Sequence, residues 1–219
     1  MAYIDFVSKI HKKTKRDYLQ RMTNEKPEII EISKKYDFDY WDGDRKYGFG
    51  GFKYDGRWKT VAEDLAEHYN LKAGDSVLDV GCGKGYLLYD LTQVVPGLKV
   101  SGVDISKYAI DNAKEEIKPY VEVADAVKLP YPDDSFDLII SLNTLHNLYV
   151  QDLKKAVQEI ERVGKKDKYV VVEAYRNERE KFNMMCWVLT GECFFSEDEF
   201  EWLLKEFGYT GDYSFIYFE

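Results

Sequence analysis

The sequence has few cysteines and prolines and no long apolar run. Its 219 residues include 3 Cys, 5 Pro and 3 His, and the cysteines lack the spacing of a metal site. No run of about 18 apolar residues is present, and the first residues lack the basic-then-apolar order of a signal peptide. We therefore expect a reduced, cytoplasmic protein that binds no metal and no membrane.

Basic residues are also fewer than acidic residues. The formal net charge is −9, from 31 Lys and Arg against 40 Asp and Glu. An acidic chain repels a phosphate backbone, so we expect a small-molecule substrate and no nucleic acid. Residues 9–21 differ, because they carry six basic side chains and one acidic side chain. This basic segment indicates a solvated helix face or a clamp for an anionic group on the substrate.

One stretch organises the chain: Ser76 to Leu88, with the sequence SVLDVGCGKGYLL. It reads as a strand, a tight glycine turn and the start of a helix, an arrangement in which backbone N–H groups face a ligand. Glycine permits the positive φ of such a turn, and it has no Cβ to collide with a neighbour.

A second apolar strand, residues 98–104, ends in Asp104 about twenty residues after the glycines. An acid at that distance can accept both ribose hydroxyls of an adenosine. The spacing Gly-x-Gly-x-Gly places Tyr86 where a dinucleotide fingerprint has its third glycine. The spacing alone therefore leaves a nicotinamide-dependent oxidoreductase open as an alternative.

Strands and helices alternate through the rest of the chain. Strands are expected over 76–80, 100–103, 121–125, 136–142, 169–174 and 213–218. Helices are expected from 58 to about 69, then over 86–94, 106–117, 153–163, 178–190 and 196–207. Such alternation predicts an α/β fold: a Rossmann-like, doubly wound, mostly parallel sheet with helices on both faces, binding its ligand at the carboxyl ends of the strands.

Residues 1–57 are expected to form an N-terminal helical extension and an aromatic lid, ahead of the main domain at 58–219. Residues 3–35 indicate two helices broken near Thr23–Pro27. From Tyr36 to Trp58, aromatics, glycines and aspartates interleave without a helical or strand period. We expect this segment to be irregular and to close from Asp42 onward over a bound cofactor and acceptor.

Three motifs together resemble the class I S-adenosylmethionine-dependent methyltransferases over residues 58–176: VLDVGCGKG at 77–85, GVDI at 102–105 and DSFDLII at 134–140. The resemblance implies S-adenosylmethionine as cofactor, with the glycine loop against its methionine part, Asp104 on the ribose and Asp125 on the adenine. The implied cofactor-binding residues are Asp79, Gly81, Cys82, Gly83, Gly85, Asp104, Ile105, Asp125, Ala126 and Asn143.

The chain departs from the family pattern in two places. Lys84 stands where a small residue is more usual, which puts a cation near the cofactor. The family ends its sheet with two antiparallel strands, whereas only about a dozen residues follow Phe207 here. We therefore expect shortened C-terminal antiparallel strands, with the second strand vestigial or missing.

The segment after the fourth strand emerges beside the reacting centre in this family, so Asn143 and His146 are the expected catalytic residues. His146 could accept a proton, since the reference pKa of histidine is near 6.5. Alternatively, His146 binds a backbone carbonyl and has no catalytic part. Methyl transfer is an in-line displacement, so orientation of the nucleophile can suffice without a base.

Aromatic and charged residues of the lid are the expected substrate contacts. They are Tyr47, Tyr54, Arg57 and Trp58, with Tyr175 after the fifth strand. Aromatic faces beside carboxylates suit a cationic amine or the sulfonium, and Arg57 could pair with the cofactor's carboxylate. The alternative is an aromatic satellite core beneath a long loop.

These features predict a methyltransferase that acts on N or O of a small polar metabolite, as a monomer or a homodimer. Two alternatives remain: the nicotinamide-dependent oxidoreductase, and a noncatalytic, methyltransferase-like interaction module. The sequence does not identify the acceptor.

Overall fold

The computed structural model describes residues 1–11, 16–22 and 25–219. Three lysines of the basic segment, Lys12, Lys13 and Lys15, lie outside the described residues. So do Thr23 and Asn24, at the expected helix break.

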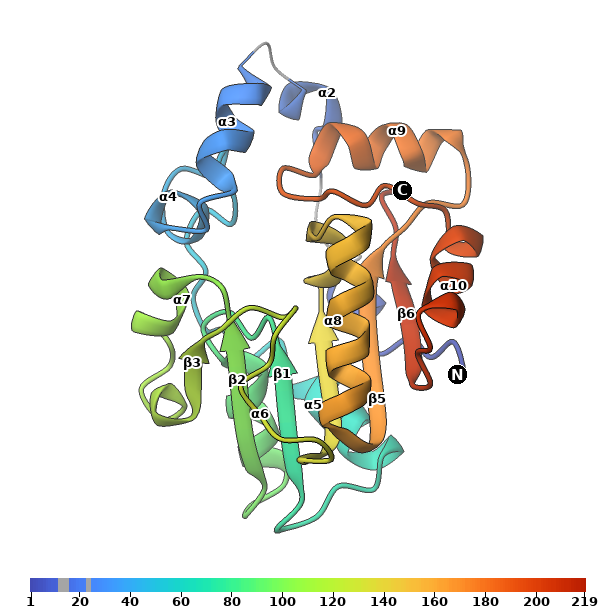
Figure 1. Ribbon diagram of the computed structural model, residues 1–219. Helices are drawn as coiled ribbons and strands as arrows, with labels where there is room; N and C mark the ends of the chain where they lie inside the picture. The colour runs from blue at the N-terminus through green and yellow to red at the C-terminus, as the bar shows by residue number, and fades with distance from the viewer. Residues whose placement is uncertain (12–15, 23–24) are drawn as a thin grey trace.

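The centre of the structure is a parallel six-stranded sheet with the order β3-β2-β1-β4-β5-β6 (Figure 1). The strands are β1 Ser76–Val80, β2 Lys99–Asp104, β3 Val121–Val123, β4 Phe136–Leu142, β5 Gly164–Glu173 and β6 Asp212–Ile216. The first strand is central, and its Val77 pairs with Val100 of β2 and Leu138 of β4. The predicted Rossmann-like α/β fold is confirmed.

Helices connect the strands and cap the sheet. Ten α-helices are present in the described residues: α1 Ser8–His11, α2 Tyr18–Arg21, α3 Lys26–Ser33, α4 Phe38–Trp41, α5 Lys59–His68, α6 Tyr86–Val94, α7 Lys107–Asp111, α8 Val150–Val163, α9 Glu178–Trp187 and α10 Glu197–Glu206. Two 3₁₀ turns, η1 Lys118–Tyr120 and η2 Leu145–Asn147, complete the set.

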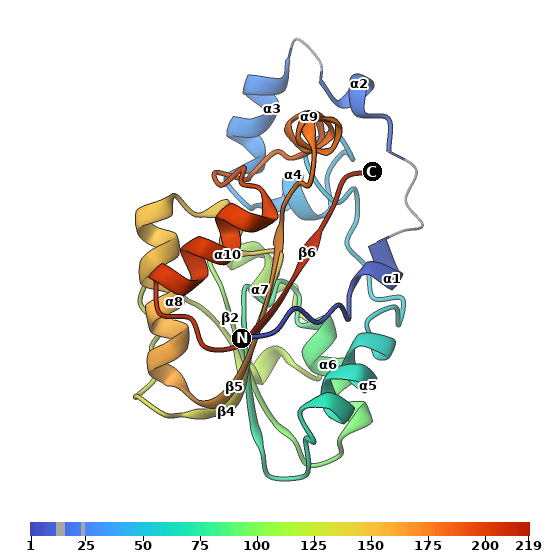
Figure 2. The same ribbon diagram turned by 90° about the vertical axis from the view of Figure 1, so that its right-hand side faces the viewer.

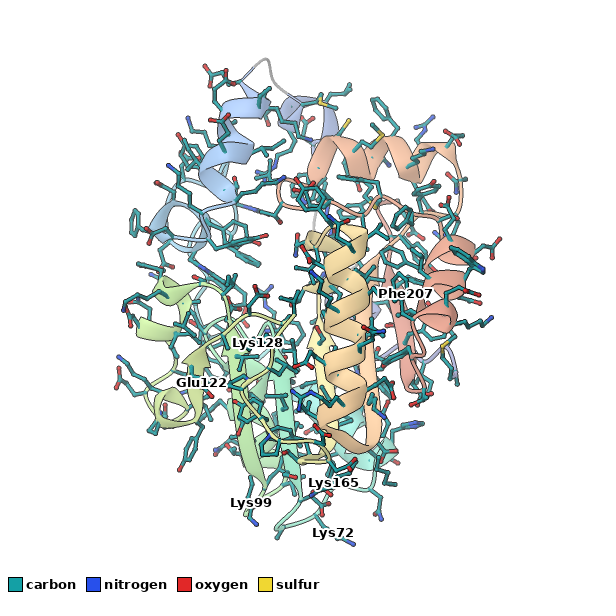
Figure 3. All side chains as sticks on the ribbon, viewed as in Figure 1. Lys72, Lys99, Glu122, Lys128, Lys165 and Phe207 are labelled. Atoms are coloured by element: carbon teal, nitrogen blue, oxygen red, sulfur yellow. The ribbon has the colours of Figure 1, made fainter. Side chains whose placement is uncertain are left out.

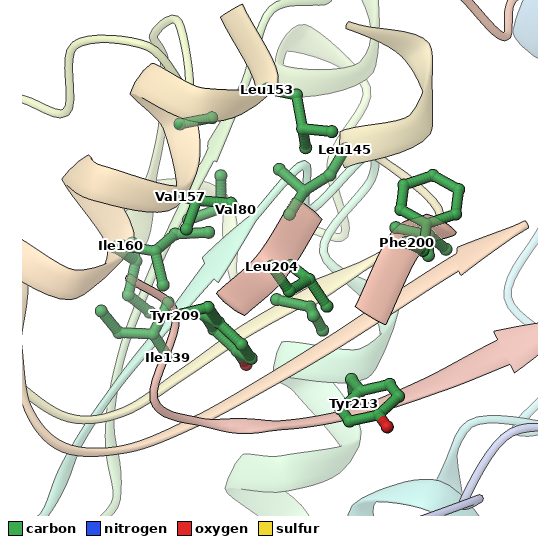
Figure 4. Close-up of a cluster of buried hydrophobic side chains, with 14 of the residues drawn as sticks. Val80, Ile139, Leu145, Leu153, Val157, Ile160, Phe200, Leu204, Tyr209 and Tyr213 are labelled. Carbon is green, nitrogen blue, oxygen red and sulfur yellow. The ribbon is translucent and has the colours of Figure 1, made fainter. Parts of the chain in front are cut away.

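Apolar side chains alternate between the two faces of the sheet, as a strand period of two requires. On one face, α8 and α10 cover Val80 and Ile139 in the cluster of Figure 4. On the other face, α5 and α6 cover Val77, Leu138 and Ile140. Burial on both faces explains why the strands read as nearly continuous apolar runs.

The last strand contradicts the expectation of antiparallel C-terminal strands. β6 pairs with β5 in parallel, from Tyr169 opposite Asp212 to Glu173 opposite Ile216. The physical reason is the connection: α10 begins with a capping box of Ser196 and Glu199 and packs on the sheet as a crossover helix. A helical crossover returns the chain to the same end of the sheet, which makes the next strand parallel.

Two further expectations need correction. The helix expected over 106–117 ends at Asp111, because the N–H of Lys114 donates to the carbonyl of Lys84 in the glycine loop and not within a helix. The aromatic segment contains one regular turn, α4, whose N-cap is Asp37. The remainder of residues 36–58 is irregular, as predicted.

The N-terminal residues contact both the core and the top of the molecule. Phe6 and Val7 are buried in the α5–α6 core, and Tyr3 forms a parallel bridge with Tyr213 of β6. The chain begins beside β6 (Figure 2). Helices α2, α3, α4 and α9 lie beyond the carboxyl ends of the strands (Figure 1). At the opposite end, Lys72, Lys99 and Lys165 project from the lower edge of the sheet (Figure 3). Among the described helices, none is both long and apolar enough to cross a membrane.

Candidate active site

The loop between β1 and α6 holds its glycines in left-handed conformations. The φ angle is +87° at Gly81 and +54° at Gly83, which glycine adopts without steric cost. A Cβ on Gly81 would lie 1.9 Å from Thr144 Oγ1, and one on Gly83 would lie 2.8 Å from Trp41 Cη2. Both positions therefore need glycine for the turn and for the close approach of a neighbouring side chain.

The carboxylate of Asp104, at the end of β2, fixes this loop. The N–H of Gly83 donates to Oδ2 and the N–H of Ser106 donates to Oδ1, each at 2.8 Å. Burial raises the pKa of Asp104, although these two donors oppose the shift. A carboxylate oxygen has more than one acceptor direction. Asp104 can therefore accept further hydrogen bonds from a ligand.

Asp79 is a buried carboxylate in β1 near the start of the loop. The residue is only 4% exposed, and its Oδ1 has no hydrogen-bond partner among the described residues. Burial, reinforced by the charge of Asp104, raises the pKa of Asp79 to about 8. An unpartnered buried carboxylate is unfavourable until a donor or a cation reaches it.

A cavity of about 560 Å³ opens over these residues at the carboxyl ends of the strands. Nine of the ten expected cofactor residues line it: Asp79, Gly81, Cys82, Gly83, Asp104, Ile105, Asp125, Ala126 and Asn143. Gly85 does not, because it forms the N-cap of α6 and faces Ile117. Ile105 is 55% exposed and offers an apolar surface to a ligand.

Lys84 does not place its charge in the cavity. Its Nζ lies 2.8 Å from both carboxylate oxygens of Asp42 and donates to the carbonyl of Phe52 at 3.1 Å. The hydroxyl of Tyr108 donates to the same carboxylate at 2.8 Å. The cation that we expected near the cofactor instead ties the aromatic segment to the glycine loop.

Two of the five expected substrate residues, Arg57 and Trp58, line the cavity. The other three do not. Tyr54 donates its hydroxyl to Asp90 at 2.6 Å, Tyr47 lies under the ammonium of Lys46, and Tyr175 forms a bridge with Ser196. Tyr54 is 40% exposed and packs its ring against Tyr86 and Tyr89 outside the cavity.

Asn143 lies in the cavity in a strained conformation. Its φ is +57°, and its buried Oδ1 has no hydrogen-bond partner among the described residues. Its backbone N–H donates to Val171 of β5 at 2.9 Å, which holds the residue in place. A left-handed residue other than glycine is sparsely populated and concentrates at functional sites.

His146 lies outside the cavity lining and faces β5. Its Nδ1 accepts from the backbone N–H of Glu173 at 3.3 Å, so the neutral ring carries its proton on Nε2, 3.2 Å from Glu173 Oε2. Burial lowers the pKa of His146 to about 3, which leaves it a weak base. This position does not support the expected proton acceptor, and we do not assign that role to His146.

Several lining residues were missed by the sequence analysis, chiefly Tyr36, Tyr40, Trp41, Arg45, Asn147 and His11. Tyr36 precedes α4 and has a φ of +50°, so no helical spacing could have predicted its position beside Tyr40. The available signal was the density of aromatic residues from Tyr36 to Trp58. Burial raises the pKa of Tyr36 to about 12, so its hydroxyl stays protonated and can donate. Within the described part of the chain, no group of three His, Cys, Asp or Glu side chains could hold a metal ion.

Comparison with known proteins places this geometry in a family. Residues 71–208 match the family model described as "Methyltransferase domain". The mitochondrial arginine-hydroxylase NDUFAF5 of Rattus norvegicus is 40% identical over 105 residues, 48% of this chain and 28% of that protein. The demethylmenaquinone methyltransferase of Symbiobacterium thermophilum is 32% identical over 128 residues, 54% of this chain and 50% of that protein.

The solved structures agree on the fold. One is the complex of the Haloferax volcanii Trm112 methyltransferase activator; the chain matched in it is 26% identical, with a TM-score of 0.54 over 70% of this chain and 73% of that chain. The YcgJ protein of Bacillus subtilis is 24% identical, with a TM-score of 0.55 over 67% of each chain. The chain spans only about a quarter to a half of the length of the two curated relatives. Since the family model covers most of the chain, this protein belongs to the methyltransferase domain family.

Proposed function

We propose that this protein is an S-adenosylmethionine-dependent methyltransferase. The principal support is the buried carboxyl group of Asp79, which lies in a cavity beside a glycine loop and whose Oδ1 has no hydrogen-bond partner among the described residues. A cationic ligand would relieve the cost of that buried carboxylate. The cofactor carries an ammonium and a sulfonium, so its chemistry fits this acidic end of the cavity.

Different residues of the chain would bind different parts of the cofactor. Asp79 would take a cationic group, Asp104 the ribose hydroxyls, and Asp125 with Ile105 the adenine. When bound, S-adenosylmethionine supplies an electrophilic methyl group on sulfur. The buried position of Cys82, whose thiol pKa is raised by burial, leaves that thiol protonated and a poor competitor for the methyl group.

The acceptor would be N or O of a small polar metabolite. Tyr36, Tyr40 and Asn143 offer hydroxyl and amide groups around the cavity, and Trp41 and Trp58 offer apolar walls. These groups can orient a nucleophile and exclude water, which supplies much of the rate enhancement in a displacement that needs no base.

The proposal also covers the class of substrate, the cellular location and the oligomeric state of the protein. The net charge of −9 favours a small-molecule substrate over nucleic acid. The three cysteines are unpaired and buried, which fits a reducing cytoplasm. We expect the protein to act as a monomer or a homodimer.

The experiment must detect methyl transfer itself, since one relative is named as a hydroxylase. We would incubate the protein with methyl-labelled S-adenosylmethionine and a fractionated small-molecule extract, and separate the products chromatographically. Label in an acceptor fraction that disappears with Asp104→Ala supports the proposal. If NADH binds and S-adenosylhomocysteine does not, the oxidoreductase alternative is correct. If S-adenosylhomocysteine binds but label is never transferred, the noncatalytic alternative is favoured.

A further inference from the structure

Three arginines of the N-terminal extension gather around one tryptophan of the C-terminal half. The guanidinium carbons of Arg16, Arg21 and Arg45 lie 5.6, 4.9 and 5.4 Å from the ring centroid of Trp187. Trp187 is the last residue of α9, which packs against α2 beyond the carboxyl ends of the strands (Figure 1). This arginine cluster therefore lies at the same end of the molecule as the cavity.

Among the described residues, no carboxylate forms an ion pair with the arginine cluster. Elsewhere Arg57 pairs with Asp55, and Lys34 pairs with Glu192. Within residues 1–11, 16–22 and 25–219, no carboxylate lies within 4.0 Å of the three guanidinium groups. Cation–π contacts with the indole stabilise each arginine singly, but the like charges repel one another.

Burial dominates the titration of the groups around the cluster. Burial first, and then Arg45, lower the pKa of Arg21 to about 10. The nearby carboxyl of Glu173 is a poor counterion, because burial raises its pKa to about 7 despite the opposing charge of Arg16. Arg45 is exposed, and Arg21 donates to the carbonyls of Trp187 and Arg45. The described residues thus give the cluster carbonyl acceptors but no carboxylate partner.

The cluster is continuous with the cavity through Arg45. Arg45 lines the cavity together with Lys53 and Arg57, and the carboxyl groups of Asp79 and Asp104 line the same cavity. Aromatic residues form much of its wall: Tyr36, Tyr40, Trp41, Phe49 and Phe52. The cavity therefore combines carboxyl groups from the ends of the strands with aromatic walls and cationic side chains from residues 45–57.

We propose that the methyl acceptor is an anion: a small aromatic or apolar molecule that carries a carboxylate or a phosphate. Arg45 binds the anionic group, Arg16 and Arg21 add charge from behind it, and the aromatic walls hold the apolar body. This inference rests on the proposed function and deepens it. It also replaces the cationic amine that aromatic and acidic residues of the lid had indicated.

The test compares four probes that share one ring: benzoate, phenyl phosphate, benzyl alcohol and benzylamine. Each is titrated calorimetrically into the protein saturated with S-adenosylhomocysteine. The proteins are the wild type, Arg45→Gln, the double variant Arg16→Gln/Arg45→Gln, and the charge-preserving Arg45→Lys. Lys99→Gln is the matched control, because Lys99 lies at the opposite edge of the sheet (Figure 3).

We expect benzoate and phenyl phosphate to bind at least tenfold more tightly than the neutral and cationic probes. The double variant should lose that tenfold preference, Arg45→Lys should keep part of it, and Lys99→Gln should keep all of it. Equal affinities for all four probes, or preference for benzylamine, would overturn the inference. The inference would also be overturned if none of the four probes bound to a protein that does bind S-adenosylhomocysteine. Failure to bind S-adenosylhomocysteine itself would instead refute the proposed function.

Discussion

The ammonium of Lys84 lies 2.8 Å from each carboxylate oxygen of Asp42, which joins the glycine loop to the aromatic segment by a charged contact. The side chain of Lys84 is only 5% exposed and that of Asp42 is 23% exposed. Phe52, ten residues further along, is held by the same ammonium. The start and middle of the proposed lid are thus anchored to the loop, and whether the lid closes further on a ligand stays a prediction.

Replacing Lys84 by Met should release the aromatic segment. The change leaves Asp42 partly buried without its cation, which should lower the free energy of unfolding by about 2 kcal/mol. Amide hydrogen exchange over residues 42–52 should become faster. The control is Lys107→Met, since Lys107 and Asp111 form an exposed pair whose loss should cost under about 0.5 kcal/mol. Equal unfolding free energies and unchanged exchange in both variants would show that the Lys84 contact does not anchor the segment.

Asp79→Asn should change the pH dependence of stability. The pKa of Asp79 is raised from 3.8 to about 8, so between these values the native state keeps a proton that the unfolded chain has released. The stability of the wild type therefore falls as pH rises from about 4 to 8 through this group. Asparagine cannot ionise, so the Asp79→Asn protein does not undergo this loss of stability with rising pH.

Urea unfolding at pH 5 and pH 8.5 measures this difference. From pH 5 to pH 8.5, the free energy of unfolding of Asp79→Asn should rise relative to that of the wild type by at least about 1.4 kcal/mol, the equivalent of one pKa unit. The same variant should bind S-adenosylhomocysteine more weakly, because the partner of its cationic group is gone. A stability difference that is identical at the two pH values would contradict the raised pKa.

His146→Gln should act on stability and not on proton transfer. Besides the two contacts of its ring with Glu173, the carbonyl of His146 accepts from the N–H groups of Glu192 and Cys193, each at 3.0 Å. Loss of the buried ring contacts should lower the unfolding free energy by roughly 1–3 kcal/mol. The affinity for S-adenosylhomocysteine, and the shape of the methyl-transfer pH profile from pH 6 to 9, should not change. A hundredfold loss of turnover in a variant of unchanged stability would instead restore His146 as a base.

The parts of the fold that could be predicted are those in which local sequence decides the structure. The apolar run at Val77–Val80, the glycines after it and Asp104 at the next strand end form a local unit, so both carboxylates were expected at the cavity. The direction of β6 could not be read from residues 213–218, because an edge strand has the same alternation in either direction. That direction depends on the crossover through α10.

The missed parts of the site depend on contacts between distant segments. Lys84 and Asp42 are 42 positions apart, and no pattern near Lys84 reveals its partner. His146 was placed in the cavity because it follows β4, but the short η2 turn directs its ring toward Glu173. The arginine cluster likewise needs Trp187, which comes from the far end of the sequence.

The central claim is that the glycine loop and the two carboxylates bind the methyl donor, and calorimetric titration of S-adenosylhomocysteine tests it most directly. The wild type should bind one equivalent, and Asp104→Ala should bind at least tenfold more weakly, a loss of roughly 1.4 kcal/mol. The control Asp198→Ala changes an exposed acid at the start of α10 and should bind like the wild type. No heat of binding in the wild type, or equal affinity in a folded Asp104→Ala protein, would contradict the account.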